Sequence, residues 1–178
     1  SITIGNSVST IEASAFYNCA GLTELTIPKS VTSVGGDAFT GCVGLKKLTL
    51  TDGNSSLRFG NNQSEYGLFN DCPIETLYLG RNVTCSVNST IAKSFQGIEQ
   101  LKTLVIGDSV TVIFQKMFRD CTGLTTLTIP SNVSSIGVSA FDGCTGIKEL
   151  VIADSDSTLT LIDEMGTHNG LFTECPLE

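Results

Sequence analysis

A stretch of 23 residues that recurs along the chain constrains the fold more than any other feature of this sequence. Residues 22–44 read LTELTIPKSVTSVGGDAFTGCVG, and residues 124–146 read LTTLTIPSNVSSIGVSAFDGCTG. A unit of this length that repeats with few changes is typical of stacked coils, in which each unit packs against its neighbours. We therefore expect a solenoid.

The motif Phe-x-x-Cys marks each unit and sets its limits. In one copy, Phe95 to Ile98, isoleucine replaces the cysteine. The complete copies are Phe16/Cys19, Phe39/Cys42, Phe69/Cys72, Phe118/Cys121, Phe141/Cys144 and Phe172/Cys175. The units that follow from them are a partial unit 1–21 and then 22–44, 45–73, 74–100, 101–123, 124–146 and 147–176. We expect a single repeat array over residues 1–178.

The units also repeat at a higher level. The units that begin at Leu22 and Leu45 recur 102 residues later, at Leu124 and Ile147. Two of the long units end alike, in GLFNDCPIE and GLFTECPLE, so duplication of a block of several units is the simplest account. Both ends of the chain lie inside a unit and show no polar capping motif, which solenoids need for solubility. We expect the chain to be a fragment of a longer protein.

Each unit begins with Leu-x-x-Leu-x-Ile or a close variant, which predicts a strand. The fourth and sixth residues share one face because side chains alternate along a strand, and successive strands can pair in parallel about 4.8 Å apart. Pro28 and Pro130 predict a turn directly after the strand, because proline cannot extend a central strand. An apolar pair such as Val31 and Val34 predicts a second, shorter strand. The segment around the phenylalanine predicts a short helical or 3-10 turn, with the Phe, the Cys and the next Leu pointing inward.

The string LxxLxIPxxVxxIGxxAFxGC, as it stands in residues 124–144, resembles the BspA-like leucine-rich repeats of bacterial and protist surface proteins. The resemblance covers the whole chain and implies a leucine-rich-repeat solenoid, a right-handed superhelix that is mostly β, with a parallel sheet on its concave side. It also implies a secreted or surface-attached parent protein, commonly an adhesin, and so an extracellular or cell-surface location. Units 45–73, 74–100 and 147–176 depart from the pattern through insertions.

Composition excludes several classes of function. The net charge is −8, from 10 Lys and Arg against 18 Asp and Glu, which argues against a surface for nucleic-acid phosphates. No apolar run approaches the roughly 20 residues that a membrane span needs. The start of the chain lacks the features of a signal peptide, as a mature fragment also would. There is no CxxC pair, HExxH or glycine-rich phosphate loop, so we expect no metal and no cofactor.

Six of the seven cysteines occupy one position of the unit, which predicts a column of buried thiols. Neighbouring positions in such a column approach the distance of a disulfide, but the bond also requires suitable Cβ directions. Free cysteine packs well as a small apolar residue, and we favour that reading. Cys85 lies outside the column, where we favour an isolated packed thiol over a disulfide with a column cysteine.

Two features have the outline of a catalytic site. GDSV at residues 107–110 is similar to a hydrolase nucleophile motif, but the same register reads GNSV at residues 5–8, so we interpret it as the turn after the strand. His168 is the one histidine and falls in an inserted segment, EMGTHNG, where a solvated surface role is favoured over a Ser-His-Asp arrangement.

The last long unit carries an acidic insertion that begins with Asp-x-Asp, like a calcium loop. Its acidic residues are Asp154, Asp156, Asp163 and Glu164. An EF-hand is rejected because Leu159 and Met165 stand where that loop needs glycine and glutamate. A solvated acidic loop is the default, and an adventitious calcium contact is the alternative.

The outward-facing third and fifth residues of each strand form the candidate binding surface. They are Glu24, Thr26, Lys47, Thr49, Thr76, Tyr78, Thr103, Val105, Thr126, Thr128, Glu149 and Val151. Rows of threonine also suit a strand surface that binds nothing. Tyr78 beside Val105 is the best candidate for an interface anchor, because tyrosine is enriched at binding hot spots. The inserted loops around Tyr66 and His168 are the competing candidates.

The sequence therefore favours a non-enzymatic binding or adhesion module of a cell-surface or secreted protein, which presents its concave sheet face to a protein or glycan partner. The alternative is an architectural spacer in a larger surface protein. A hydrolase that uses His168 is the weakest hypothesis. Nothing in the residues names the ligand.

Overall fold

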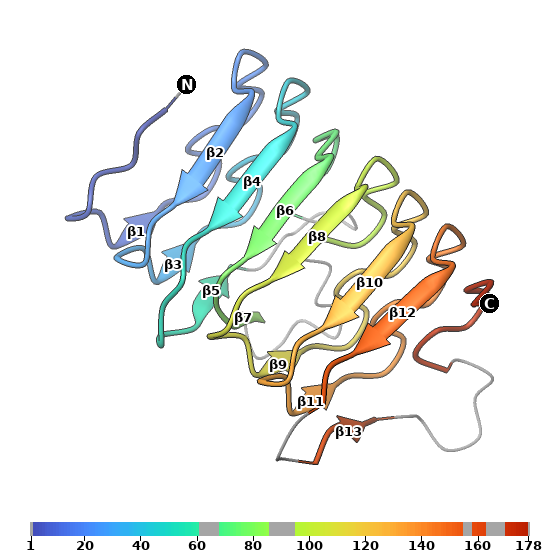
Figure 1. Ribbon diagram of the computed structural model, residues 1–178. Coiled ribbons are helices and arrows are strands. Elements are labelled where there is room, and N and C mark those ends of the chain that lie inside the picture. The colour runs from blue at the N-terminus through green and yellow to red at the C-terminus, as the bar shows by residue number, and fades with distance from the viewer. Residues whose placement is uncertain (1, 61–67, 86–94, 155–157, 163–169, 178) are drawn as a thin grey trace.

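The computed structural model describes residues 2–60, 68–85, 95–154, 158–162 and 170–177. In these residues the chain winds into successive coils stacked along one axis, with the two termini at opposite ends of the array (Figure 1). Each coil contributes one four-residue strand to a broad parallel layer and, on a second side, one strand of two or three residues. This confirms the predicted parallel solenoid.

The broad layer, which we call the main sheet, contains the strands that begin each unit. They are β2 (Glu24–Ile27), β4 (Lys47–Leu50), β6 (Thr76–Leu79), β8 (Thr103–Ile106), β10 (Thr126–Ile129) and β12 (Glu149–Ile152). Paired strands run parallel and equivalent residues lie opposite one another, as Leu25, Leu48 and Leu77 do. The repeated sequence pattern therefore becomes rows of like residues across the sheet.

The second layer contains the shorter strands that the apolar pairs predicted. They are β1 (Thr10–Ile11), β3 (Ser33–Val34), β5 (Leu57–Phe59), β7 (Val83–Cys85), β9 (Val112–Ile113), β11 (Ser135–Ile136) and β13 (Thr160–Leu161). Val34, Ile113 and Ile136 are fully buried, because they point between the two layers toward the same core as the main sheet.

The phenylalanines of the Phe-x-x-Cys motif form a continuous column through the core. Six successive ring pairs, from Phe16–Phe39 to Phe141–Phe172, stack with centroids 5.3–5.6 Å apart and interplanar angles of 4–11°. Each such pair contributes roughly 0.5–1.5 kcal/mol beyond the burial of its area. The column confirms that the same inward position is filled in every coil.

The segment around each phenylalanine is a chain of turns, and the expected helical or 3-10 turn is not formed. Turn hydrogen bonds run from Ala15 N to Glu12 O and from Tyr17 N to Ser14 O, and no described residue lies in a helix. The cause is left-handed backbone two residues before and two residues after the ring, as at Ser14 (φ 57°) and Asn18 (φ 57°). A right-handed helix cannot continue through such residues.

Backbone pairing is interrupted at two places. In the main sheet, β2, β4, β6 and β8 form one hydrogen-bonded set and β10 and β12 another. In the second layer the break falls between β7 and β9. There the side chain of Asn82 bridges the two strands: its Oδ1 accepts from the amides of Thr111 and Val112, at 2.9 and 3.1 Å, and its Nδ2 donates to Thr111 Oγ1.

Candidate binding face

The outer side of the main sheet carries the predicted binding residues, and we call this surface the strand face. Its twelve side chains are Glu24, Thr26, Lys47, Thr49, Thr76, Tyr78, Thr103, Val105, Thr126, Thr128, Glu149 and Val151, all exposed or half-buried. They point outward because the residues between them, such as Leu48 and Leu127, point into the core.

Strand pairing brings these side chains into two rows. One row runs through Glu24, Lys47, Thr76 and Thr103, and the other through Thr26, Thr49, Tyr78 and Val105. Beyond the break in the main sheet, Thr126 lies opposite Glu149 and Thr128 opposite Val151. The face is therefore polar and mostly uncharged, with Val105 and Val151 as its exposed apolar side chains, each 44% exposed.

Tyr78 is held in place by a carboxylate that the sequence did not single out. Its hydroxyl donates to Asp52, and the two carboxylate oxygens lie at 2.8 and 2.9 Å. This hydrogen bond to Asp52 raises the pKa of Tyr78, with smaller contributions from burial and from the charges of Asp52 and Asp108. A Cβ built on Gly107 would lie 2.9 Å from the hydroxyl. Glycine at position 107 therefore leaves the space that the tyrosine hydroxyl and Asp52 occupy.

A row of alternating charge borders the strand face. Glu75 lies between Lys46 and Lys102, with nitrogen–oxygen distances of 3.3 and 3.0 Å. Hydrogen bonds from Lys102 and Lys46 lower the pKa of Glu75. Both lysines are well exposed, so these pairs add little to folding stability. They set the charge pattern along one margin of the strand face.

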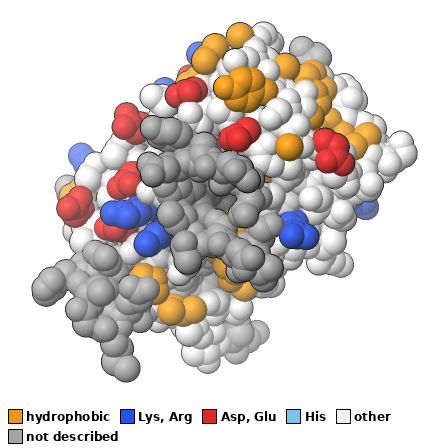
Figure 2. Space-filling view, turned by 180° about the vertical axis from the view of Figure 1, so that it is seen from behind, with side chains coloured by type: hydrophobic (Ala, Val, Ile, Leu, Met, Phe, Trp, Pro, Cys, Tyr) orange, Lys and Arg blue, Asp and Glu red, His pale blue; other side chains and the backbone are white. Residues whose placement is uncertain are grey.

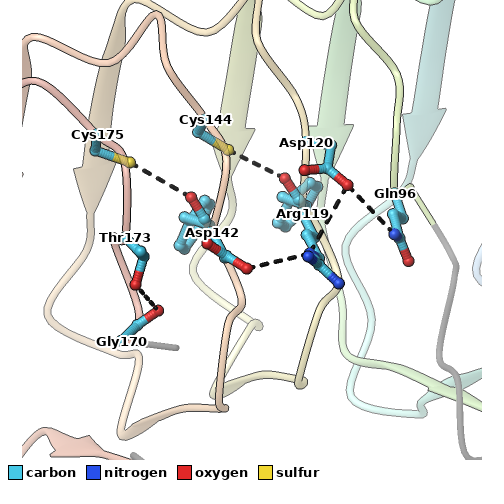
Figure 3. A network of polar contacts seen from close by, with 10 residues as sticks. Gln96, Arg119, Asp120, Asp142, Cys144, Gly170, Thr173 and Cys175 are labelled. Atoms are coloured by element: carbon cyan, nitrogen blue, oxygen red, sulfur yellow. Dashed lines mark hydrogen bonds and ion pairs between the residues drawn. The ribbon is translucent and has the colours of Figure 1, made fainter. Parts of the chain in front are cut away.

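The column cysteines are thiols that bond to the neighbouring coil. All but Cys19, which lies in the first coil, donate to the carbonyl of the phenylalanine one coil earlier, as Cys144 does to Phe118 and Cys175 to Phe141 (Figure 3), with sulfur–oxygen distances of 3.1–3.4 Å. Burial raises the pKa of Cys72 and of Cys144 to about 12. Such thiols stay protonated and unreactive at neutral pH, so the column has a packing role.

Cys85 lies apart from the column, as expected. It is half-buried at the end of β7, opposite Phe59 of β5.

Of the two segments that are similar to parts of a catalytic site, the structure describes one, the GDSV segment at residues 107–110. In the GDSV segment, Val110 N donates to Gly107 O at 3.1 Å, and Val8, Val31 and Val133 make the same bond in their own coils. The segment is therefore the turn after the strand, as predicted. His168, Tyr66, Asp156, Asp163 and Glu164 lie outside the described residues.

On the opposite side, polar contacts link successive coils at the turns. Arg119 Nε lies 3.1 Å from the buried carboxylate of Asp142 and 3.8 Å from Asp120, which also accepts from Gln96 (Figure 3). On the face seen from behind, the described basic side chains are few, and some of them lie beside acidic ones (Figure 2). The described residues of this face form no continuous basic surface of the kind that binds nucleic acid.

The part of the chain that the structure describes contains no group of three or more His, Cys, Asp and Glu residues placed to hold a metal ion. No helix there has the length and apolar character needed to cross a bilayer.

Parallel coils that bury several rows of leucine and isoleucine, one phenylalanine column and one thiol column define a leucine-rich-repeat solenoid. Residues 1–63 and 65–165 match the BspA type leucine rich repeat region in six copies. The chain belongs to this family.

Solved structures show the same fold. The chain is similar to a leucine-rich repeat protein of T. pallidum, with 26% identity and a TM-score of 0.60, over 84% of this chain and 64% of that one. It is also similar to a leucine-rich repeat protein from Bacteroides ovatus, with 20% identity and a TM-score of 0.52, over 85% of this chain and 42% of that one. The chain thus spans less than two thirds of either. No curated protein was found to be similar in sequence.

Proposed function

We propose that the chain is a non-enzymatic binding module of a secreted or cell-surface protein, and that the strand face receives a protein or glycan partner. The observation that carries this proposal is the pair of in-register rows across the main sheet, where outward side chains are exposed or half-buried. No described helix or strand lies over this face (Figure 1). The proposed surface location rests on membership of the BspA-type family, because such repeats are expected in secreted or surface-attached proteins.

The chemistry of the face favours a partner with polar groups and a small apolar contact. Threonine hydroxyls donate and accept hydrogen bonds, while Tyr78 and Val105 lie opposite each other and offer an apolar contact. The bond to Asp52 orients the tyrosine ring before any partner arrives, which reduces the ordering cost of binding.

The proposal is tested with the purified chain as the probe, on a glycan array and on a yeast-displayed library of extracellular proteins. Tyr78→Ala with Val105→Ala should weaken any captured interaction by roughly tenfold or more, as for hot-spot residues. Tyr17→Ala with Val43→Ala is the matched control, because these side chains are 52% and 58% exposed at the turns. Thermal unfolding checks that both variants fold.

Capture that survives the strand-face variant, or is weakened equally by the control, contradicts the proposal. Failure of both screens to capture a partner would contradict the proposal and favour the spacer.

A further inference from the structure

The main sheet has a built-in break between β8 and β10. The two strands lie side by side (Figure 1), yet among the described residues no backbone hydrogen bond joins them. The core residues of β8 are more exposed at this break than their equivalents elsewhere. Leu104 and Ile106 are each 8% exposed, whereas the equivalent Leu48 and Leu50 are 0% exposed. Water therefore reaches the edge of β8 more closely than it reaches any other main-sheet strand inside the array.

The cause of the break is Pro130. At the other junctions the residue after the strand donates its N–H to the last carbonyl of the preceding strand, as Gly107 does to Leu79 at 2.8 Å and Ala153 to Ile129 at 2.9 Å. Proline has no N–H, and its ring carbon occupies the place of the hydrogen. Carbon cannot approach the carbonyl of Ile106 as closely as an amide can, so the two strands separate.

The side chain of Asn132 partly replaces the missing hydrogen bonds between the two coils. Asn132 Nδ2 donates to Gly107 O and to Val110 O, and so ties the turn after β10 to the turn after β8. The strands themselves stay apart, because this bond lies beyond their ends.

Pro28 is the other proline that directly follows a main-sheet strand. Pro28 stands 102 residues before Pro130, and residues 2–4 are the equivalents of residues 104–106. Ile2 and Ile4 pack against the core beside β2, yet residues 2–4 form no strand with it. The absence of a strand beside β2 agrees with the role assigned to the proline at this position.

Away from the strand face, the coils of β8 and β10 are joined by backbone hydrogen bonds and by ring stacking. Phe118 N donates to Ala140 O at 2.9 Å, and Gly137 N donates to Ile113 O at 2.8 Å in the second layer. The rings of Phe118 and Phe141 stack at 5.4 Å, as at every other junction. The two coils are therefore held at the turns and in the second layer, and are unbonded only along the strand face.

We propose that this junction is a proline-encoded joint, at which the strand face opens and closes about the Phe column. The main sheet is then a chain of hydrogen-bonded blocks, such as the four strands β2 to β8, linked by compliant junctions. The curvature of the strand face changes at the joint, between Val105 and Thr128. The inference concerns the fold and stands whether or not the strand face binds a partner.

Amide hydrogen exchange followed by NMR tests the joint in the whole chain. The amides of Thr126 and Thr128 face β8, so they should exchange roughly tenfold or more faster than those of Val105 and Val151, which face paired strands. Pro130→Ala restores the donor and should slow Thr126 and Thr128 to the rate of Val151.

The reverse substitution is the matched control. Ala153→Pro removes the equivalent bond between β10 and β12, so it should raise the exchange rate of Val151 by the same factor and leave Thr49 in β4 protected. Slow exchange of Thr128 in the unaltered chain would overturn the proposal, and so would unchanged rates in Pro130→Ala. The second result stands even if Ala153→Pro fails to fold.

Discussion

The carboxamide of Asn18 fills the space beside Gly41 in the next coil. A Cβ built on Gly41 would lie 1.9 Å from Asn18 Oδ1, so a side chain at position 41 is incompatible with the asparagine. The same relationship holds one block later, where a Cβ on Gly143 would lie 2.3 Å from Asp120 Oδ1. The residue before each column cysteine position has positive φ. Along the array this residue is alternately a polar side chain and a glycine: Asn18, Gly41, Asp71, Gly97, Asp120, Gly143 and Glu174.

This alternation predicts strong coupling between positions 18 and 41. Gly41→Asn should lower the free energy of unfolding by about 1–3 kcal/mol, because the new side chain overlaps Asn18. In an Asn18→Gly background the same change should cost at least about 1 kcal/mol less, since asparagine tolerates positive φ and the space is then open. Chemical denaturation of the four proteins gives the coupling energy. Additive costs would show that the two sites are independent.

The thiol column predicts a loss of stability in alkali. The pKa of Cys144 is about 12 in the folded chain and 9.0 when unperturbed. A raised folded pKa means that the contribution is complete below about pH 9 and is lost as the pH rises toward about 12, because the unfolded chain loses the proton first. The difference in unfolding free energy between the unaltered chain and Cys144→Ala should shrink by about 1 kcal/mol from pH 9 to pH 10. A constant difference would mean that the thiol ionises equally in both states.

We expect the buried side chain of Arg81 to stabilise the fold. It is fully buried and donates to the carbonyls of Lys29 and Pro28 at 3.1 and 2.9 Å, two coils earlier, passing Gly53 on the way. Burial lowers its pKa. Arg81→Ala should cost about 2–4 kcal/mol, from lost packing and an unsatisfied carbonyl.

Arg81→Met separates these two causes, because methionine keeps much of the volume without the charge. We expect it to cost about half as much as alanine in chemical denaturation. Lys29→Ala keeps the backbone acceptor and should change stability by less than about 0.5 kcal/mol. Equal losses in the alanine and methionine variants would assign the whole effect to the hydrogen bonds.

The Phe column predicts costs that depend on position in the array. Phe118 is fully buried between two stacked rings, whereas Phe16 is half-buried and stacks on one. Phe118→Ala should cost about 3–5 kcal/mol and Phe16→Ala clearly less. Thermal and urea unfolding compare the two. Similar costs would show that the end coil packs as tightly as the interior ones, against the nearest-neighbour description of solenoids.

Much of the fold could be predicted because every coil makes the same contacts as the coil before it. Leu48, Phe118 and Cys144 were expected to point inward on the strength of their unit position alone, and each is fully buried. The placement of the strand-face residues followed from two-residue alternation. The prediction of a helical turn was wrong because the sequence alone does not show that residues such as Ser14 and Asn18 adopt a positive φ.

What the sequence by itself determined is the set of positions that repeat: the strands, the two buried columns and the outward rows. Only the tertiary structure decided the contacts that do not repeat, such as Tyr78 with Asp52 and Arg81 with Pro28. These join residues 26 and 53 apart in the sequence, and they form only because the stacking brings their coils together. Pro130 was visible in the sequence, but its effect on the sheet required the carbonyl of Ile106 beside it, and stacking alone supplies that neighbour.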